Sequence, residues 1–469
     1  MRQKKLIALC LGCLLPGATW ADSVTFTTAY PVGETVTIGA GCESGVPSVT
    51  WQDGTTETLP ATGTPSEIRL KSQTFTINAG EGRLTSVYAP NAGLTALDLT
   101  DAPHLEALVC PHNQLERLNL NSAERLTTLD VQDNAIQSLA IQRTCDELTT
   151  LNCAYNQLST LLLGNKPKLT TLICAGNALS TLTLTNLTKL TTLWCQDNAL
   201  KRLNLSPTTS LEQLYAFNNE LTLISGVPTT LTELWVDRNA LTELDLRAAK
   251  GLKEIAIDHN SLHLVEMSSE NSNSLSYFYG HNNTLSFNSF PTLRRLDGYA
   301  VAPQEPFDLG ITPVVGNEVD INDYFVRNAW GQATGYGVNN NFVWYDAASG
   351  TPLTEGEDYE RRATGCFTFL KDFPQGVYAT AYSSQYPEPI RTATAAVVPV
   401  GINDIQASNS LSVRTATGLL TVESAAPVHV KVVNAEGRLI IDAPAVSGTT
   451  SWPLAKGVYI VNGHKVLVP

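Results

Sequence analysis

Cysteine recurs in this sequence at a fixed place relative to asparagine. The segments LNCAYNQL (151–158), LICAGNAL (172–179) and LWCQDNAL (193–200) each place a cysteine three residues before an asparagine. With a fourth cysteine at the same place, the set called the cysteine ladder is Cys110, Cys153, Cys174 and Cys195. Regularly spaced thiols could form disulfides, bind a metal ion or take part in redox chemistry.

The surroundings of the cysteine ladder favour a simpler role. Few polar groups recur beside the thiols, and parallel side chains on adjacent strands seldom reach the torsion that a disulfide requires. We therefore interpret the four thiols as inert interior residues that act as small hydrophobic groups. The sequence leaves open whether Cys42, Cys145 and Cys366 are free.

Other candidates for chemistry are sparse. His259 and His263 are four residues apart, but we expect them on a turn and a coil rather than on one helix face, so we predict no metal pair there. The segment WQDGTTE (51–57) resembles a β-turn more than a calcium loop. GxSxG, HExxH, P-loop and GxGxxG motifs are missing from the sequence. We predict no catalytic residue, cofactor or metal, and a hydrolase with an unrecognised site in 302–400 remains an alternative.

A repeat explains the spacing of the cysteines. The unit LxxLxCxxNxLxxLxL returns every 20 to 23 residues, with Val, Ala, Ile or Gly sometimes replacing Cys, and we count eleven coils between Leu84 and Val301. The asparagines of the unit, called the asparagine ladder, are Asn113, Asn134, Asn156, Asn177, Asn198, Asn219, Asn239, Asn260 and Asn283. A unit this short encloses no core alone, but stacked units bury a continuous one. We therefore predict a mainly β solenoid over 81–301.

The period-two step around each cysteine predicts which side chains face the core. Leu151 and Cys153 should point inward from a short strand, and Asn152 and Ala154 outward. Each ladder asparagine should bond backbone groups of its own and the next coil. The pattern resembles the leucine-rich repeat, and the cysteine ladder resembles that of internalin-type surface proteins. In this sequence Val131 interrupts the cysteine ladder, and the ladder ends at Cys195.

In leucine-rich repeats the outward strand residues line a concave face. At this position Trp194, Tyr215 and Trp235 follow one another in successive coils, and we call them the aromatic stripe. Rigid aromatic side chains with polar neighbours are typical of a binding surface; the alternative is that the rings pack on one another and only stiffen the sheet. The residues predicted to bind a partner are Ile173, Trp194, Tyr215, Phe217, Trp235, Asp237, Asp258 and Tyr279.

Short β runs flank the repeat on both sides. We predict an N-terminal β cap over 22–80, because a solenoid end exposes core and needs covering. Residues 302–400 have strand and turn signals at β-sandwich spacing, and internalins likewise place an Ig-like module after their repeats. Residues 401–469 predict a further β module, which resembles the C-terminal sorting domain of type IX secretion through VVNAEGRLI, LAKGVYIV and a final KVLV. That resemblance implies surface attachment and removal of the module near 401–410.

The N-terminal sequence and the overall charge limit where the protein can be located and which partners it can bind. Basic residues, an apolar run and small residues over 1–21 predict a signal peptide cleaved after Ala21. We expect no transmembrane segment in the mature chain, and a net charge of -14 argues against nucleic acid as a partner. We predict an exported, adhesin-like protein, extracellular or on the outer membrane surface, that recognises a protein or glycan on host or bacterial surfaces. A secreted regulator or inhibitor of another extracellular protein is the alternative.

Overall fold

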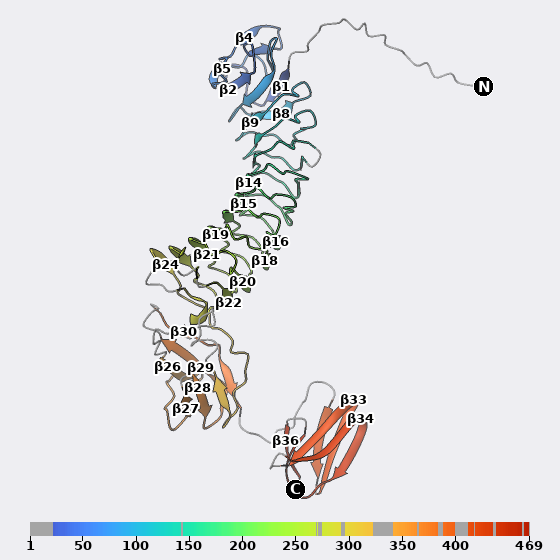
Figure 1. Ribbon diagram of the computed structural model, residues 1–469, viewed down its shortest axis with the longest axis vertical. Helices are drawn as coiled ribbons and strands as arrows, with labels where there is room; N and C mark the ends of the chain where they lie inside the picture. Colours follow the sequence, from blue (N-terminus) through green and yellow to red (C-terminus); the bar gives the residue numbers. More distant parts are fainter. Residues whose placement is uncertain are drawn as a thin grey trace, which may run out of the picture. The chain divides into compact units, whose positions relative to one another are not determined.

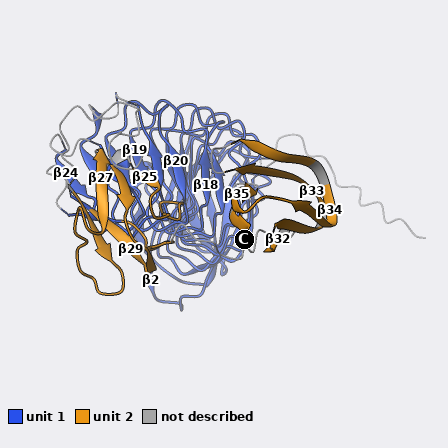
Figure 2. Cartoon of the chain, turned by 90° about the horizontal axis from the view of Figure 1, so that it is seen from below, with its two compact units in different colours: residues 1–307, 323–341, 381–391 blue, residues 308–322, 342–380, 392–469 orange. Residues whose placement is uncertain are grey.

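The computed structural model describes residues 22–141, 144–268, 270, 274–291, 296–321, 341–363, 365–382, 388–398, 411–416, 418–434, 438–461 and 464–468. The predicted signal peptide and the predicted cleavage segment lie outside them. The chain forms two compact units, coloured separately in Figure 2: residues 1–307, 323–341 and 381–391 form the first, and 308–322, 342–380 and 392–469 the second. Within the described ranges, no helix is long and apolar enough to cross a membrane.

A sheet of 13 strands organises the first unit (Figure 1). From β7 to β24 all neighbours pair in parallel, with one strand for each repeat, which confirms the predicted β-solenoid. These strands are β7 (Leu84–Tyr88), β9 (Ala107–Val109), β10 (Thr128–Asp130), β12 (Thr150–Asn152), β14 (Thr171–Ile173), β15 (Thr192–Trp194), β17 (Gln213–Tyr215), β19 (Glu233–Trp235), β21 (Glu254–Ala256), β23 (Tyr277–Tyr279) and β24 (Gly298–Ala300).

Shorter elements lie between these strands along the chain. They are the paired strands β11 (Leu139–Ala140) and β13 (Leu161–Leu162), β16 (Arg202–Asn204) and β18 (Leu223–Ser225), and β20 (Glu243–Asp245) and β22 (Leu264–Glu266), with the 3-10 helix η1 (Phe287–Ser289). The repeat leucines of both sets of strands are buried; Leu151 and Leu203, for example, are at most 1% exposed. Each coil thus contributes apolar side chains from two sides to one continuous core.

The asparagine ladder holds successive coils together. Asn177 is typical: its Nδ2 donates to the carbonyls of Cys153, Cys174 and Ala175 at 3.0–3.2 Å, and its Oδ1 accepts from the backbone N–H of Leu158 at 3.0 Å. The amide therefore bonds its own coil and the preceding one, not the next coil as predicted, and satisfies backbone groups of an interior turn. Gln304 makes equivalent bonds to Gly280, Val301 and Leu285 after the last asparagine, which the sequence pattern did not indicate.

The residue before each ladder asparagine has a left-handed backbone. Its φ lies between 51° and 63° in all nine coils from His112 to Asn282. Seven of the nine residues are of the types that adopt this conformation most readily, namely glycine, asparagine, aspartate and histidine. Tyr155 and Arg238 are the exceptions, and there the asparagine bonds and the stacking of the coils hold a turn that the local sequence does not favour.

The N-terminal strands belong to two sheets, the 13-stranded one and a five-stranded one that contains β8 (Leu94–Asp98). They are β1 (Ser23–Thr28), β2 (Thr35–Cys42), β3 (Ser48–Trp51), β4 (Thr56–Thr58), β5 (Ser66–Arg69) and β6 (Thr74–Asn78), and β1 pairs with β8 of the first coil. Strand β2 pairs antiparallel with β7. Phe75 packs between Phe26 and Trp51, with ring centroids 5.1 and 5.5 Å away. This aromatic core lies at the N-terminal end of the solenoid core.

The second unit contains a small β-sandwich. Its described strands are β25 (Glu318–Asp320), β26 (Asn341–Asp346), β27 (Tyr359–Ala363), β28 (Cys366–Phe369), β29 (Phe373–Tyr382) and β31 (Ala395–Val397), whereas β30 (Ile390–Arg391) is counted with the first unit. Strands β25, β28 and β27 form one sheet, and β26 and β29 belong to another. Trp344 of β26 is 1% exposed and packs against Phe367 and Phe369 of β28, at 5.6 and 4.9 Å between centroids. The next residue, Tyr345, is half-buried and stacks on Tyr378.

The C-terminal strands form a five-stranded antiparallel sheet. They are β32 (Leu411–Ala416), β33 (Leu419–Asn434), β34 (Leu439–Pro453), β35 (Gly457–Val461) and β36 (His464–Val468). The sheet curves around a core that includes Leu420, Val432 and Val461, each 0% exposed. Strand β33 ends at Asn434 and pairs antiparallel with β34, which begins at Leu439; residues 435–437 lie outside the described residues.

Candidate functional site

The aromatic stripe lies on three adjacent strands of the 13-stranded sheet. Trp194 of β15 is opposite Tyr215 of β17, which in turn is opposite Trp235 of β19. The Trp194 and Tyr215 rings are tilted by 35° with centroids 5.3 Å apart, and Tyr215 and Trp235 meet edge to face at 5.8 Å. All three side chains are half-buried because each ring covers its neighbour. The rings therefore stiffen the sheet and also leave part of their surface accessible.

Tyr215 is oriented by a carboxylate of the next coil. Its hydroxyl donates to Glu233 Oε2 at 2.8 Å, and Gln213 Nε2 donates to the other carboxylate oxygen at 3.0 Å. Burial and the hydrogen bond to Glu233 together raise the pKa of Tyr215 to about 12. The phenol is therefore neutral at physiological pH and acts as a hydrogen-bond donor that is fixed in one direction.

A cavity of about 330 Å³ opens beside the stripe. It is lined by Asp197, Phe217, Asn218, Trp235, Asp237 and Arg238. Phe217 and Trp235 supply apolar walls, and Asp197 and Asp237 supply carboxylates. A depression with two aromatic walls and several charged or polar groups suits a polar or charged side chain of a bound partner.

Asp237 is the most unusual polar residue of this cavity. Burial, and secondarily the charge of Asp258 on the next coil, raises the pKa of the Asp237 carboxyl. Its closest cation is Arg238 Nε, 3.8 Å from Oδ2, and that guanidinium is largely exposed. The ionised carboxylate is therefore poorly compensated, and a cationic group of a partner would stabilise it.

Buried polar atoms without a hydrogen-bond partner are concentrated on the concave face. Within the described ranges there are five in this region: Trp194 Nε1, Gln196 Oε1, Trp235 Nε1, Asp237 Oδ1 and His281 Nδ1. The other two, on Trp51 and Trp344, lie in the cap and in the sandwich. An unpaired buried donor or acceptor costs free energy, so its presence calls for an explanation such as a bound ligand or water.

The remaining predicted partner-binding residues share this face. Ile173 and Tyr279 are half-buried at the same strand position as the stripe, and Asp258 is half-buried at the position of Asp237 one coil later. Asn152 and Ala154, which we predicted to point outward from their strand, are nevertheless buried, at 9% and 1% exposure. Asn152 Nδ2 donates to Gln132 Oε1 at 2.8 Å, so the neighbouring coil covers it.

Sequence reasoning missed one group on this face. It considered His259 together with His263, but the structure places His263 Nε2 beside Glu243, at 3.3 Å. His259 instead lies beside His281 of the next coil, with ring centroids 5.1 Å apart, and both contact Asp258. Alignment of the coils on their asparagines contains the signal, since Asp258 and His281 each stand two residues before a ladder asparagine.

The cysteine ladder lies inside the solenoid, away from this face. All four thiols are at most 1% exposed. Burial raises the pKa of Cys110, Cys153 and Cys195 to about 12 and that of Cys174 well above its ordinary value. Cys145 is also buried, and Cys42 and Cys366 are half-buried. The environment of the ladder thus suppresses thiolate formation, which thiol chemistry requires.

Comparisons with known proteins find similarities of fold. No protein-family model and no curated protein sequence matches the chain. Among solved structures, the functional domain of InlJ from Listeria monocytogenes, which includes a cysteine ladder, has a TM-score of 0.43 and 20% identity over 65% of this chain and 69% of its own. YopM from Yersinia enterocolitica gives 0.38 and 22% over 47% and 56%, and the Listeria monocytogenes internalin InlF gives 0.26 and 18% over 47% and 87%.

Proposed function

We propose that this protein binds another macromolecule through the concave face of its solenoid, as an adhesin-like protein at a bacterial surface or in the extracellular space. The observation that carries the proposal is the aromatic stripe with the adjoining cavity of about 330 Å³. Half-buried, preoriented rings provide contact area at a small cost in conformational entropy. The unpaired buried atoms around them are hydrogen-bonding groups with which a partner would form hydrogen bonds.

The charges around the stripe favour a protein partner with basic side chains. Glu233 lies against Tyr215, and Asp197 and Asp237 line the cavity. An arginine or lysine of the partner would pair with these carboxylates and stack on an aromatic face. A glycan, which would stack its apolar ring face on the same aromatics, is the competing ligand.

The termini lead to a proposal about location. The predicted signal peptide supports export, and the sequence resemblance of 401–469 supports type IX secretion with removal of that module. Mass-spectrometric mapping of the protein on intact cells tests this. Peptides from 22–400 should be recovered, and recovery of 411–469 from surface-bound protein would contradict removal.

Binding is tested with a triple variant, Trp194→Ala, Tyr215→Ala and Trp235→Ala. The labelled full chain is titrated onto epithelial cells, bacterial cells and matrix-coated wells. We expect saturable binding to at least one surface and at least a tenfold loss in the triple variant, because central aromatic residues dominate interface energetics. The matched control replaces two exposed aromatics outside the stripe, Tyr30→Ala and Tyr155→Ala, which are 36% and 55% exposed.

Treatment of the target surface identifies the class of ligand. Protease treatment should abolish binding to a protein partner, whereas glycosidase treatment should leave it intact. Equal binding of the triple variant and the wild type, with both proteins folded, would overturn the proposal. Failure of the wild type to bind any of the surfaces would count against an adhesin and in favour of a soluble extracellular partner.

A further inference from the structure

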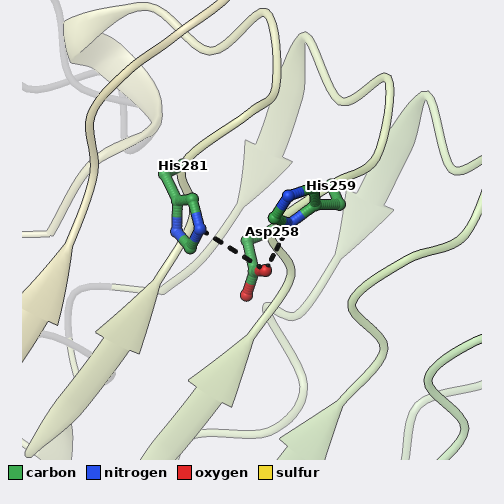
Figure 3. Close-up of side chains that lie close together, drawn as sticks. All are labelled: Asp258, His259 and His281. Carbon is green, nitrogen blue, oxygen red and sulfur yellow. Dashed lines mark hydrogen bonds and ion pairs between the residues drawn. The ribbon is translucent and has the colours of Figure 1, made fainter.

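Two histidines and an aspartate from adjacent coils meet on the concave face (Figure 3). Asp258 Oδ2 is 2.8 Å from His259 Nδ1 and 3.7 Å from His281 Nε2. One ligand-type atom from each of the three side chains lies within 4.8 Å of the other two. The described part of the chain contains no other cluster of three or more histidine, cysteine, aspartate or glutamate residues with this geometry.

We propose that Asp258, His259 and His281 bind a divalent transition-metal ion, with zinc as the best fit. Two imidazoles and one carboxylate suit Zn²⁺ and its neighbours in the first transition row, whereas Ca²⁺ and Mg²⁺ require oxygen ligands. Tetrahedral bonds of about 2.0–2.1 Å place ligand atoms about 3.3 Å apart. The observed separations of 2.8 and 3.7 Å lie on either side of this value, and the two histidine ligand atoms lie within 4.8 Å of each other.

The hydrogen bonds around His259 are compatible with a metal ligand. Asn282 Nδ2 lies 2.8 Å from His259 Nε2. Rotation of the Asn282 amide would present its oxygen to this nitrogen, which would then carry the proton and leave Nδ1 free for the metal. Asn282 would thus fix the ring and its tautomer, as partners of metal-bound histidines commonly do.

His281 supplies the second, independent observation. Its Nδ1 is buried and has no hydrogen-bond partner, and its Nε2 is too far from the carboxylate for a hydrogen bond. The nitrogen that faces Asp258 is Nε2, so its lone pair is available to a metal ion held between the two side chains. Binding there would leave the proton on Nδ1.

The site is accessible from solvent and leaves room for a further ligand. The side chains of His259, His281 and Asp258 are 42%, 26% and 13% exposed. Three protein ligands leave one tetrahedral position for water or for a group of a bound partner. Asp237, one coil earlier at the position of Asp258, adds negative charge that favours a cation here.

The test uses the full chain without a polyhistidine tag, freed of metal by dialysis against a chelator. Zinc chloride is titrated by calorimetry, and Co²⁺ is titrated by visible absorption, which reports coordination geometry. We expect one equivalent of each ion to bind. His259→Gln, His281→Gln and Asp258→Asn should each weaken binding at least tenfold, and Asn282→Ala by about tenfold, the usual effect of losing a partner of a metal-bound histidine.

His112 offers a matched control. It stands immediately before a ladder asparagine, as His259 does, and its Nδ1 lies 2.7 Å from Asp133 Oδ2 of the next coil. That pair belongs to no three-residue cluster, so His112→Gln should bind zinc as the wild type does. The unfolding temperature of each variant, measured without metal, shows whether it is folded. Because four substitutions test the site independently, the remaining variants still test it if one of them fails to fold.

Three results would overturn the proposal. One is the absence of saturable binding by the wild type at up to about 1 mM zinc. Another is unchanged affinity in a folded His281→Gln variant. The last is an intense thiolate-to-cobalt absorption in the near ultraviolet, which would assign the ion to cysteine.

Discussion

The hydroxyl of Tyr215 donates a 2.8 Å hydrogen bond to Glu233, which belongs to the next coil of the solenoid. This bond links β17 to β19 on the concave face and turns the central ring of the aromatic stripe toward Trp235. Since Gln213 donates to the second oxygen of the same carboxylate, Glu233 serves two donors at once. The orientation of the stripe thus depends on a hydrogen-bond pair as well as on ring packing.

Removing the Tyr215 hydroxyl tests this dependence. Tyr215→Phe should lower the free energy of unfolding by about 1 kcal/mol, the usual net value of one hydrogen bond. Glu233→Gln keeps one acceptor oxygen but places an amide NH2 group against the other donor, so it should cost at least as much as Tyr215→Phe. Thermal and denaturant unfolding provide the measurement. An unchanged stability of Tyr215→Phe would show that the hydroxyl bond does not stabilise the stripe.

The asparagine ladder should be the most sensitive polar element of the solenoid. Asn177→Ala removes four hydrogen bonds and leaves interior backbone groups unpaired. We expect a loss of about 2–4 kcal/mol in stability, since each unpaired buried group costs about 1–3 kcal/mol. Asn165→Ala, an exposed asparagine outside the ladder, is the control and should change stability by less than about 0.5 kcal/mol. Similar losses in both variants would contradict a special role of the ladder.

Thiol reactivity should separate the cysteine ladder from Cys42. At pH 8 a thiol of pKa about 12 carries more than about 100-fold less thiolate than a free cysteine of pKa about 8.5. Burial also raises the pKa of Cys42, but this thiol is only half-buried, so alkylation followed by peptide mapping should modify it well before Cys110, Cys153, Cys174 or Cys195. In strong denaturant all should react. Alkylation of the ladder in the native protein at the rate of Cys42 would refute its interior position.

The fold was largely predictable because the sequence unit that determines it repeats at a nearly constant interval. The recurring asparagine sets the register of every strand from β9 to β23, so the interior leucines and the stripe follow from alignment of the coils alone. Burial between adjacent coils was less predictable. Ala154 is small enough for its neighbours to cover it, and Asn152 is covered through its bond to Gln132. Outward position on a strand therefore does not ensure exposure when coils are closely stacked.

The sequence did not reveal the histidine cluster, because the short spacing of His259 and His263 suggested the wrong pair of residues. His259 and His263 suggest a pair only if the chain is helical, whereas in a solenoid proximity follows the coil period. His281 lies 22 residues after His259, in a coil longer than most, and Figure 3 shows it facing Asp258. No local motif identifies such a group; it emerges only when the positions before each ladder asparagine are compared across coils. The nature of the partner for the stripe has no such periodic signature.

The buried carboxyl of Asp237 predicts a pH-dependent effect of known sign. Because burial and Asp258 raise its folded pKa above the unfolded value of about 3.9, the ionised side chain destabilises the fold at neutral pH. Below the unfolded pKa both states are protonated and the penalty disappears. Asp237→Asn should therefore stabilise the protein at pH 7, on the order of 1 kcal/mol for each unit of pKa shift, and the gain should shrink as the pH falls from 7 to 4.

Asp245 provides a control of opposite sign on the same solenoid. Its pKa is lowered, chiefly by the hydrogen bonds from Arg247 at 2.9 and 2.7 Å, so its ionised form stabilises the fold above the unfolded pKa. Asp245→Asn should slightly destabilise the protein at pH 7, and this loss should persist to about pH 4 and vanish only as the pH falls further, through the lowered folded pKa of Asp245. Unfolding temperatures of both variants from pH 7 to about pH 2 provide the measurement. If Asp237→Asn destabilises the protein at pH 7, then the negative charge of Asp237 is already compensated in the free protein, and no cationic partner is needed to stabilise it.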